Sequence, residues 1–304
     1  MRTSCIKLTF FIFISLFFSS CGDEKNTRAN DNATTSPDDP IFCLNLVNGL
    51  ATTKFPSVVA IMRQEGNLYS LCSGTFISHN TLVTAAHCID DSTMGGVFYI
   101  PGHYIKYINN EWEQRVTPLK ALHNENAILY SGGSQSIQMS DSVVDLAILI
   151  FPDNTAPATT PLLGRTLTEG ESVTVIGYGK TSTTNPDLNT PVVRRYGQNE
   201  AILEPSGIFK QYVLKEGLVA TIGRSETDTS SVKSCSLSTD SQAAEGDSGG
   251  PLFSDDSIAA ITSMGHTDTN AQKDIAIFVD LNSEESKSLL STAKDEGATI
   301  DLTD

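Results

Sequence analysis

The chain has 304 residues and carries 36 acidic against 20 basic side chains, a formal net charge of −16 at neutral pH. Removal of residues 1–20 takes away two basic residues and no acidic one, which leaves −18. A surface this acidic repels nucleic acid and anionic lipid headgroups, so it argues against polyanion partners. The length suits one large domain after a short leader better than two independent domains.

Residues 1–20 have the three parts of an export signal. Arg2 and Lys7 give a positive start, residues 8–18 form an apolar core, and two serines form a small-residue end. The apolar core is shorter than the ~20 residues that are needed to cross a bilayer. The segment therefore predicts a cleaved signal peptide rather than a permanent membrane span.

The cysteine that follows these serines adds a second feature to the leader. Cys21 resembles the lipidated residue of a bacterial lipobox, with Phe18 in place of the usual leucine. We expect Cys21 to carry a lipid that anchors the exported protein to the bacterial cell envelope. The alternative is ordinary secretion, with cleavage nearby and an unmodified thiol. Residues 21–45 then form a lipidated cysteine, a tether and a pro-segment, because residues 22–40 are polar and lack large apolar side chains.

Residues 46–304 have the pattern of one all-β domain. Short apolar runs recur between Gly, Pro, Asn and Ser residues, and a long helical pattern appears only at 283–296, where Leu289, Leu290 and Ala293 fall on one face. This pattern predicts a β-sandwich or β-barrel that ends in a helix. The strand-like runs are residues 58–62, 97–100, 146–151, 172–176 and 276–281.

Three polar residues stand beside apolar runs and form a candidate catalytic set. His87 lies between small alanines and a cysteine at the end of a strand-like run. Asp145 opens the apolar run DLAILIF, where a partly buried charge needs a partner, although alone it also fits a solvated strand-end turn. Ser248 lies in GDSGGP, whose glycines let the backbone turn sharply and expose the hydroxyl. This hexapeptide alone also fits an acidic turn.

Together these residues predict nucleophilic catalysis. A serine hydroxyl is a poor nucleophile without an adjacent base and without donors aimed at the developing oxyanion. Asp145 can hold a histidine tautomer, His87 can take the proton from Ser248, and Ser248 can then attack a carbonyl.

Three motifs in this order, TAAHC, DLAIL and GDSGGP, resemble those of the chymotrypsin/trypsin-like serine proteases. The segments LVNG at 46–49, GYG at 177–179 and SMG at 263–265 resemble that family's IVNG start, GWG turn and SWG edge segment. The matches keep their order over about 230 residues, so the combination is far more specific than any one motif. The resemblance implies two six-stranded antiparallel β-barrels with the active site between them, and the activity of a serine endopeptidase.

The resemblance also assigns roles to residues. His87, Asp145 and Ser248 match the catalytic triad, the N–H groups of Gly246 and Ser248 match the oxyanion hole, and Ser263 begins the edge segment that pairs with substrate backbone. Substrates would be proteins or peptides. We expect neither a cofactor nor a metal, because the sequence shows no histidine–carboxylate cluster with ligand spacing. The competing hypothesis is an inactive homologue that acts as a surface binding or adhesion lipoprotein.

Two further residues match the primary specificity pocket. Gln242 stands at its floor, where trypsin-like members carry an aspartate that attracts arginine or lysine, and Gly265 leaves room on its wall. An amide cannot compensate for the desolvation of a cation, so we expect cleavage after neutral residues. A broad, poorly selective pocket is the alternative. Ala244 replaces a cysteine of the family, and a looser wall can let Asp240 or Glu245 restore some basic preference.

The same resemblance predicts a zymogen. A new N-terminus at Leu46 would insert into the domain and pair with Asp247, and its large aliphatic side chain suits burial as the family's isoleucine does. Asn45 is not basic, which argues against activation by a trypsin-like enzyme and leaves the activating protease unidentified.

The cysteines outside the lipobox divide into one expected pair and an open question. The resemblance pairs Cys72 with Cys88 across the histidine loop, and an exported protein can form this bond. Cys5 leaves with the signal. Cys43 and Cys235 either pair with each other or stay as two free thiols, since the family's local partner for Cys235 is absent.

Overall fold

The computed structural model describes the chain between residues 49 and 303 with several gaps. The expectations for the signal peptide, Cys21, Cys43, Leu46 and Cys235 concern residues outside the described part. The described residues are 49–65, 68–89, 97–100, 104–105, 107–108, 111–112, 116–123, 144–179, 192–204, 214, 217–224, 241–268 and 273–303.

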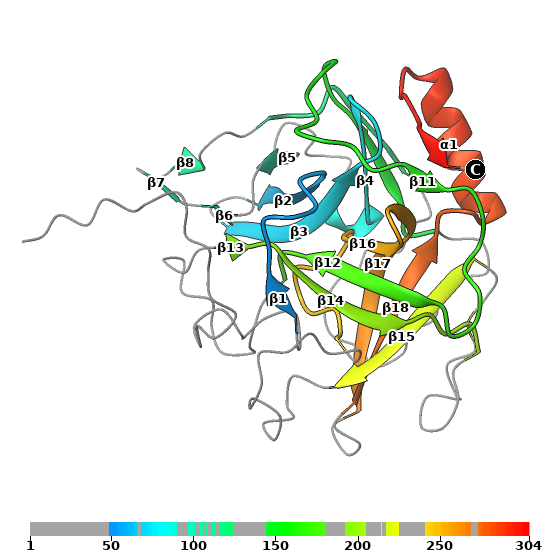
Figure 1. Cartoon of the computed structure of the whole chain (residues 1–304). Helices are drawn as coiled ribbons and strands as arrows, with labels where there is room; N and C mark the ends of the chain where they lie inside the picture. Colours follow the sequence, from blue (N-terminus) through cyan, green and yellow to red (C-terminus); the bar gives the residue numbers. More distant parts are fainter. Residues whose placement is uncertain are drawn as a thin grey trace, which may run out of the picture. The chain divides into compact units, whose positions relative to one another are not determined.

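Six antiparallel strands form the first sheet, in the order β5-β2-β3-β4-β10-β9 (Figure 1). Strand β2 pairs with both β3 and β5, and β4 pairs with both β3 and β10. The strands are β2 (Val58–Glu65), β3 (Leu68–Phe76), β4 (Thr81–Thr84), β5 (Val97–Ile100), β9 (Lys120–His123) and β10 (Ala147–Ile150).

Strand β10 is buried on both faces, which explains its continuous apolar run. Ile148 and Ile150 belong to one buried apolar cluster, while Ala147 and Leu149 belong to another. Successive side chains of a strand alternate between its two faces, so a strand between two cores needs apolar residues at every position. Strand β4 is fully buried in the same way.

The second sheet is built around the antiparallel strands β14-β12-β16-β17-β18-β15. Just beyond β14, Ile202 bridges Ala220 of β15 through backbone hydrogen bonds of 2.8 and 2.9 Å. This bridge joins the last strand of the order to the first, so the sheet closes into a barrel. The strands are β12 (Ser172–Gly177), β14 (Arg195–Glu200), β15 (Leu218–Arg224), β16 (Pro251–Ser254), β17 (Ser257–Asp268) and β18 (Lys273–Asp280).

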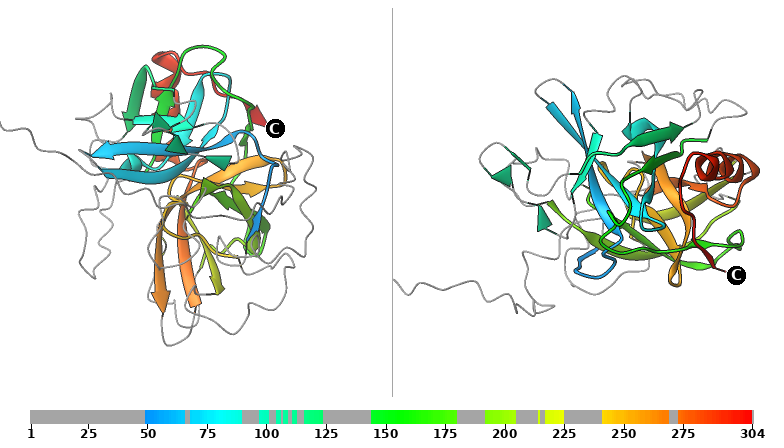
Figure 2. Two further views of the ribbon diagram at one scale, coloured as in Figure 1. Left: turned by 90° about the vertical axis from the view of Figure 1, so that its left-hand side faces the viewer. Right: turned by 90° about the horizontal axis from the view of Figure 1, so that it is seen from above.

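Three short strands extend the second sheet beyond the expected six. β1 (Leu50–Ala51) pairs antiparallel with β14, and β11 (Leu162–Leu163) runs parallel to both β17 and β19 (Leu302–Thr303). In the left view of Figure 2, the blue and cyan strands of the first sheet lie above the orange and yellow strands of the second. The expected architecture of two antiparallel β-barrels with a C-terminal helix is confirmed, and the five strand-like runs fall in β2, β5, β10, β12 and β18.

Helix α1 (Glu284–Asp295) follows the last long strand. Ser283 caps it, because its Oγ accepts a backbone N–H of the first turn at 3.2 Å. Leu290 and Ala293 are buried in the apolar core, and the partly buried Leu289 packs on the same cluster. The helix predicted over 283–296, with these three residues on one face, is confirmed.

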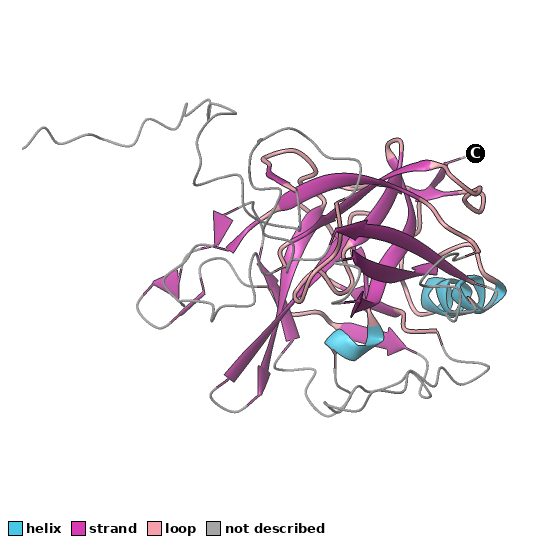
Figure 3. Cartoon of the chain, turned by 90° about the horizontal axis from the view of Figure 1, so that it is seen from below, coloured by secondary structure: helices cyan, strands magenta, loops and turns pink. Residues whose placement is uncertain are grey.

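Strands make up most of the regular structure in the described residues (Figure 3). The helical elements there are α1 and a short 3-10 turn, η2 (Ala86–Cys88). None of the described helices has the length and apolar character that a bilayer span requires. Two small ribbons complete the described elements: β6 (Tyr104–Ile105) with β13 (Val192–Val193), and β7 (Tyr107–Ile108) with β8 (Glu111–Trp112).

Candidate active site

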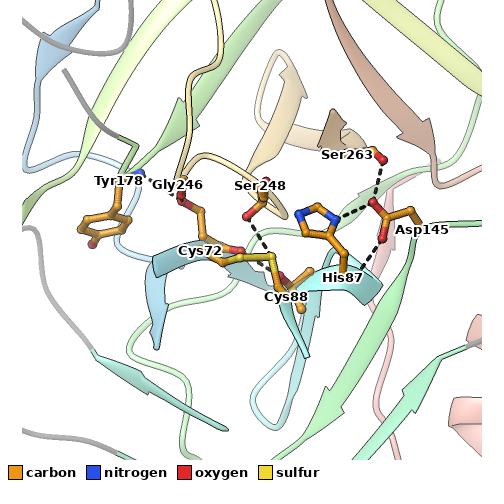
Figure 4. The surroundings of a disulfide bond; sticks show 10 residues. Cys72, His87, Cys88, Asp145, Tyr178, Gly246, Ser248 and Ser263 are labelled. Carbon is orange, nitrogen blue, oxygen red and sulfur yellow. Dashed lines mark hydrogen bonds and ion pairs between the residues drawn. A yellow bond between two sulfur atoms is a disulfide. The ribbon is translucent and has the colours of Figure 1, made fainter. Parts of the chain in front are cut away.

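The three candidate catalytic residues come from both sheets and lie close together (Figure 4). His87 lies on η2 just after β4, and Asp145 lies just before β10. Because β4 and β10 are antiparallel with Thr84 opposite Ala147, the end of one strand meets the start of the other at the same edge. Ser248 precedes β16 of the second sheet. The fold thus brings residues that are far apart in sequence to one place.

Two hydrogen bonds join His87 to Asp145. The backbone N–H of His87 donates to Oδ1 at 3.0 Å, and the imidazole Nδ1 lies 2.8 Å from Oδ2. An ionised carboxylate only accepts hydrogen bonds, so Nδ1 carries the proton and Nε2 of the neutral ring is an acceptor. In Figure 4 the imidazole lies between Asp145 and Ser248, with this second nitrogen on the side of the serine. The ring is therefore oriented to accept a proton from the Ser248 side.

A third donor reaches Asp145 from β17. The hydroxyl of Ser263 donates to Oδ2 at 2.6 Å (Figure 4). Burial by itself raises the pKa of Asp145, but the hydrogen bonds and charge of His87, together with the Ser263 hydroxyl, hold that pKa below its ordinary value. Asp145 is thus ionised at neutral pH and fixes the imidazole tautomer. Ser263 was expected at the substrate-binding edge, and its side chain serves Asp145.

The backbone N–H groups of the turn around Ser248 divide into two sets. Those of Gly246 and Ser248 have no acceptor among the described residues, whereas the other three are bonded. Two unpaired donors at alternate positions of one turn are the arrangement that stabilises an oxyanion. In the bonded set, the N–H of Asp247 donates to the carbonyl of Ala244 at 2.9 Å. The N–H of Gly249 donates to the carbonyl of Thr262 at 2.7 Å, and the N–H of Gly250 donates to the carbonyl of Asp247 at 2.8 Å.

A glycine is required where this turn meets the first sheet. Gly249 has φ +76°, a backbone conformation that L side chains rarely adopt. A Cβ at this position would lie 2.0 Å from Oγ1 of Thr84 and 2.5 Å from the carbonyl oxygen of Ser73. The turn that carries Ser248 therefore packs directly on the strands that lead to His87.

Asp247 is completely buried beneath the turn. Its carboxylate accepts the N–H of Gly179 at 2.7 Å and the N–H of Ala244 at 2.8 Å. Burial raises the pKa of Asp247 to about 6, against the opposing effect of these two hydrogen bonds and of the charge on buried Arg195. A Cβ at Gly179 would lie 2.4 Å from the carboxyl carbon, so the GYG turn needs a glycine there. Leu46, the expected partner of Asp247, lies outside the described residues.

The disulfide predicted between Cys72 and Cys88 is confirmed, with 6.1 Å between the two Cα atoms. It ties β3 to η2 and so restrains the segment that carries His87. Sγ of Cys88 lies 3.6 Å from the carbonyl oxygen of Ser248, and because a disulfide sulfur has no proton this is a packing contact. The two sulfurs and the His87 ring lie within 4.8 Å of one another, but the disulfide removes the thiolates that a metal site would need.

The amide of Gln242 is used entirely within the protein. Its side chain is completely buried, Nε2 donates to the carbonyls of Thr221 and Asp274 at 3.0 and 2.9 Å, and Oε1 accepts from the Thr221 hydroxyl at 2.6 Å. Gln242 therefore brings neither a charge nor an unused amide proton to its position. Gly265 lies on β17, where a Cβ would meet only the Ile275 carbonyl at an ordinary 3.5 Å. Gly265 pairs with Ala276 of β18 and is exposed, so an added Cβ would meet no closer atom of the described residues.

Comparison with known proteins agrees with the fold and the site. The family model described as Trypsin matches residues 48–285, and the chain belongs to the trypsin family. A curated relative, the vitellin-degrading protease of Bombyx mori, is 22% identical over 244 residues, which cover 77% of this chain and 80% of that protein. The protein is thus a serine-protease-like member of the family, and the low identity leaves its specificity to be argued from its own residues.

Two residues beneath the site are not among the site residues predicted from the sequence. Ser73 of β3 and Thr84 of β4 are completely buried, and both contact the Ser248 turn. In a single sequence, a serine or threonine in an apolar strand looks like any other strand residue. The one local signal for Ser73 is its place directly after Cys72, a residue of the predicted disulfide.

Proposed function

We propose that the protein is a serine endopeptidase that forms an acyl-enzyme on Ser248. The observation that carries this proposal is the pair of hydrogen bonds between His87 and Asp145, beside a turn in which the N–H groups of Gly246 and Ser248 are unpaired among the described residues. Membership of the trypsin family supports peptide bonds as the substrate.

In the first half of the reaction, Ser248 Oγ attacks the carbonyl carbon of the scissile bond as its proton passes to Nε2 of His87. The negative charge on the substrate oxygen is stabilised by the N–H groups of Gly246 and Ser248. Asp145 stabilises the imidazolium, which then protonates the leaving amine as the C–N bond breaks. The product of this half is an ester of Ser248.

In the second half, water replaces the amine. His87 takes a proton from the water while the water oxygen attacks the ester carbon, and the same two N–H groups stabilise the oxyanion. Collapse returns the proton to Ser248 Oγ and releases the carboxylic acid. No net oxidation or reduction occurs, and the three side chains return to their starting states.

The experiment that tests the proposal is hydrolysis of a mixed peptide library by purified mature protein, with Ser248→Ala as the matched control. New peptide termini from the wild type and none from the variant support the proposal. Equal cleavage by both proteins would assign the activity to another residue. No cleavage by the wild type would favour the inactive, surface-binding homologue.

We infer a preference for neutral side chains before the scissile bond. The uncharged Gln242, its amide occupied, supports this because a buried guanidinium or ammonium would lack a counter-charge there. Of the acids that can restore a basic preference, Glu245 is exposed and Asp240 lies outside the described residues. A dominance of arginine or lysine among the library cleavage sites would contradict this inference.

We propose further that cleavage after Asn45 activates the enzyme. The new amine of Leu46 would meet the carboxylate of Asp247, whose oxygens each accept one backbone N–H and can accept more. N-terminal sequencing of the purified active protein tests this step. An active chain that runs uninterrupted through residues 45 and 46 would contradict it.

Export and anchoring remain a proposal from the sequence alone. We propose that residues 1–20 are removed and that Cys21 is lipidated, which places the domain on the bacterial cell envelope behind a tether. Intact mass and fractionation of the native protein test both steps. Cys21→Ser should release a membrane-bound protein into the soluble fraction, because acyl chains supply the apolar area that holds it.

A further inference from the structure

Ser73 lies at the centre of the contacts that hold the turn of Ser248. It is completely buried in β3, directly after Cys72 of the disulfide. Its hydroxyl donates to the carbonyl of Gly246 at 3.0 Å and accepts the backbone N–H of Tyr178 at 3.0 Å. Its own backbone N–H donates to the carbonyl of Ser248 at 2.8 Å. One residue thus binds two carbonyls of the turn.

These two carbonyls flank the peptide that carries the Ser248 N–H. The carbonyl of Gly246 belongs to the peptide between residues 246 and 247, and that of Ser248 to the peptide between 248 and 249. Each peptide unit is planar, so fixing its oxygen fixes the direction of the whole unit. The two fixed peptides hold the peptide between 247 and 248, which lies between them. The N–H of Gly246, which precedes the first of them, is held through the same residue.

We propose that Ser73 is a positioning residue for the oxyanion hole, acting through the carbonyls of Gly246 and Ser248. The inference rests on the proposed peptidase activity. Gly246 has φ +98°, in a region that glycine enters freely, so its own backbone preference leaves the direction of the turn undetermined. The Ser73 hydroxyl adds a second restraint to this peptide, whose N–H donates to the carbonyl of Ala244, and ties it to Tyr178 of the GYG turn, beside which Asp247 is buried.

Loss of the hydroxyl has a defined consequence. In Ser73→Ala the carbonyl of Gly246 and the N–H of Tyr178 both lose the partner that joins them, in a site without exposed surface. The peptide between residues 246 and 247 then keeps the bond from its N–H to the carbonyl of Ala244 but loses the one at its oxygen, so its direction is less restrained. The oxyanion donors are misaligned in the transition state, while the surface that binds the ground-state substrate is unchanged.

The test compares Ser73→Ala with Thr75→Val in the purified active protein. Thr75 is a matched control because it is completely buried on the same strand and its hydroxyl has no partner among the described residues. Removal of one oxyanion donor costs about 10²–10³ in kcat in a related chemistry, so we expect about a 10- to 100-fold fall for misalignment in Ser73→Ala. The KM should stay within about 3-fold of the wild type, and Thr75→Val should keep its kcat.

A second readout separates positioning from general loss of structure. A peptidyl trifluoromethyl ketone forms a tetrahedral adduct whose oxyanion occupies the hole, so its inhibition constant should rise by the same factor by which kcat falls. Ser73→Cys keeps a weaker donor at the same place and should give an intermediate kcat. This variant also serves if Ser73→Ala does not fold.

Two results would overturn the proposal. One is a kcat of Ser73→Ala and Ser73→Cys equal to that of the wild type. The other is a fall in kcat that leaves inhibition by the trifluoromethyl ketone unchanged. Both require an active wild type, whereas a wild type that cleaves no peptide at all would overturn the proposed function instead.

Discussion

Asp145, which is partly buried, and Asp247, which is completely buried, are carboxylates of the same site, yet their pKa values shift in opposite directions. Burial raises both, but Asp145 accepts two hydrogen bonds from His87 and one from Ser263, which bring its pKa below the ordinary value. Asp247 accepts only two backbone N–H groups in the described structure, and its pKa rises to about 6. The number and kind of donors, rather than burial alone, therefore decide the direction in which each pKa shifts.

This difference corresponds to two tasks. Asp145 belongs to the half of the site on the first sheet, where the ionised carboxylate orients the neutral imidazole of His87, which can accept a proton. Asp247 belongs to the half on the second sheet, where the turn of Ser248 is held by backbone bonds, glycines and the Ser73 hydroxyl. One half supplies the base, and the other supplies the nucleophile and the oxyanion donors.

The largest expected effect comes from removing the link between the two halves. Ser248→Ala and His87→Ala should each lower kcat by about 10⁶, and the double variant should be no worse than either one, because the two side chains act as a unit. Single-turnover kinetics with a peptide ester would measure this. Additive losses in the double variant would show that the halves act independently. Melting temperatures should change little, since each side chain borders the open site.

Breaking the Asp145 half should have a smaller effect. Asp145→Asn keeps the shape but offers His87 an amide that can donate, so the imidazole loses the tautomer that accepts from Ser248. A fall in kcat of about 10⁴ is expected for this change in a Ser–His–Asp triad. Ser263→Ala is the control, because it removes one donor and leaves the tautomer intact. A larger loss in Ser263→Ala than in Asp145→Asn would contradict the assigned roles.

The Asp247 half should show itself in the pH dependence of stability. Since the folded-state pKa of about 6 lies above the ordinary aspartate value of 3.8, the folded chain binds this proton more tightly than the unfolded chain. The resulting stabilisation is present below pH 4 and is lost as the pH rises through 6, a change of about 3 kcal/mol.

Urea unfolding of the uncleaved chain measures this change, in a Ser248→Ala background that prevents self-digestion. Between pH 4 and pH 8 the parent should lose about 3 kcal/mol relative to the same chain with Asp247→Asn. Identical pH dependence in the two proteins would contradict the raised pKa. Cleavage after Asn45 should reduce the difference, because the new amine supplies a counter-charge.

A carboxylate outside the site gives the smallest effect. Glu171 accepts a bidentate pair of hydrogen bonds from Arg165 at 2.8 and 2.9 Å, and mainly this contact lowers its pKa to about 2. Its stabilisation is present above pH 4.5 and is lost as the pH falls toward 2. Because Arg165 is half exposed, Glu171→Gln should cost only about 1 kcal/mol at pH 7. Chemical denaturation would measure this, and a change in kcat would contradict the separation from the active site.

The sequence predicted those parts of the site that rest on local patterns. After its aspartate, the run DLAILIF is apolar at every position because β10 lies between two cores. This pattern predicts the strand and makes the charged residue at its start unusual. The glycines of GDSGGP likewise predict a sharp, closely packed turn, and in the structure Gly249 packs against Thr84 where no Cβ fits. The disulfide between Cys72 and Cys88 followed from the family resemblance.

Other features depend on contacts between distant segments and leave no local signature. Ser73 lies 173 residues before Gly246, whose carbonyl oxygen accepts a hydrogen bond from the Ser73 hydroxyl. The three short strands of the second sheet pair across similar separations, β11 with β19 among them, and two-residue strands carry no periodicity. The occupied amide of Gln242 likewise depends on β15 and β18, which only the folded chain brings to it.

The central claim is that His87, held by Asp145, activates Ser248. Labelling of the mature protein with a fluorophosphonate, followed by mass spectrometry of its peptides, tests this most directly, because the reagent reacts only with an activated serine. We expect one phosphonylated residue, Ser248, in the wild type, and no label in Ser248→Ala or His87→Ala. Absence of label in mature protein, or equal labelling in His87→Ala, would contradict it.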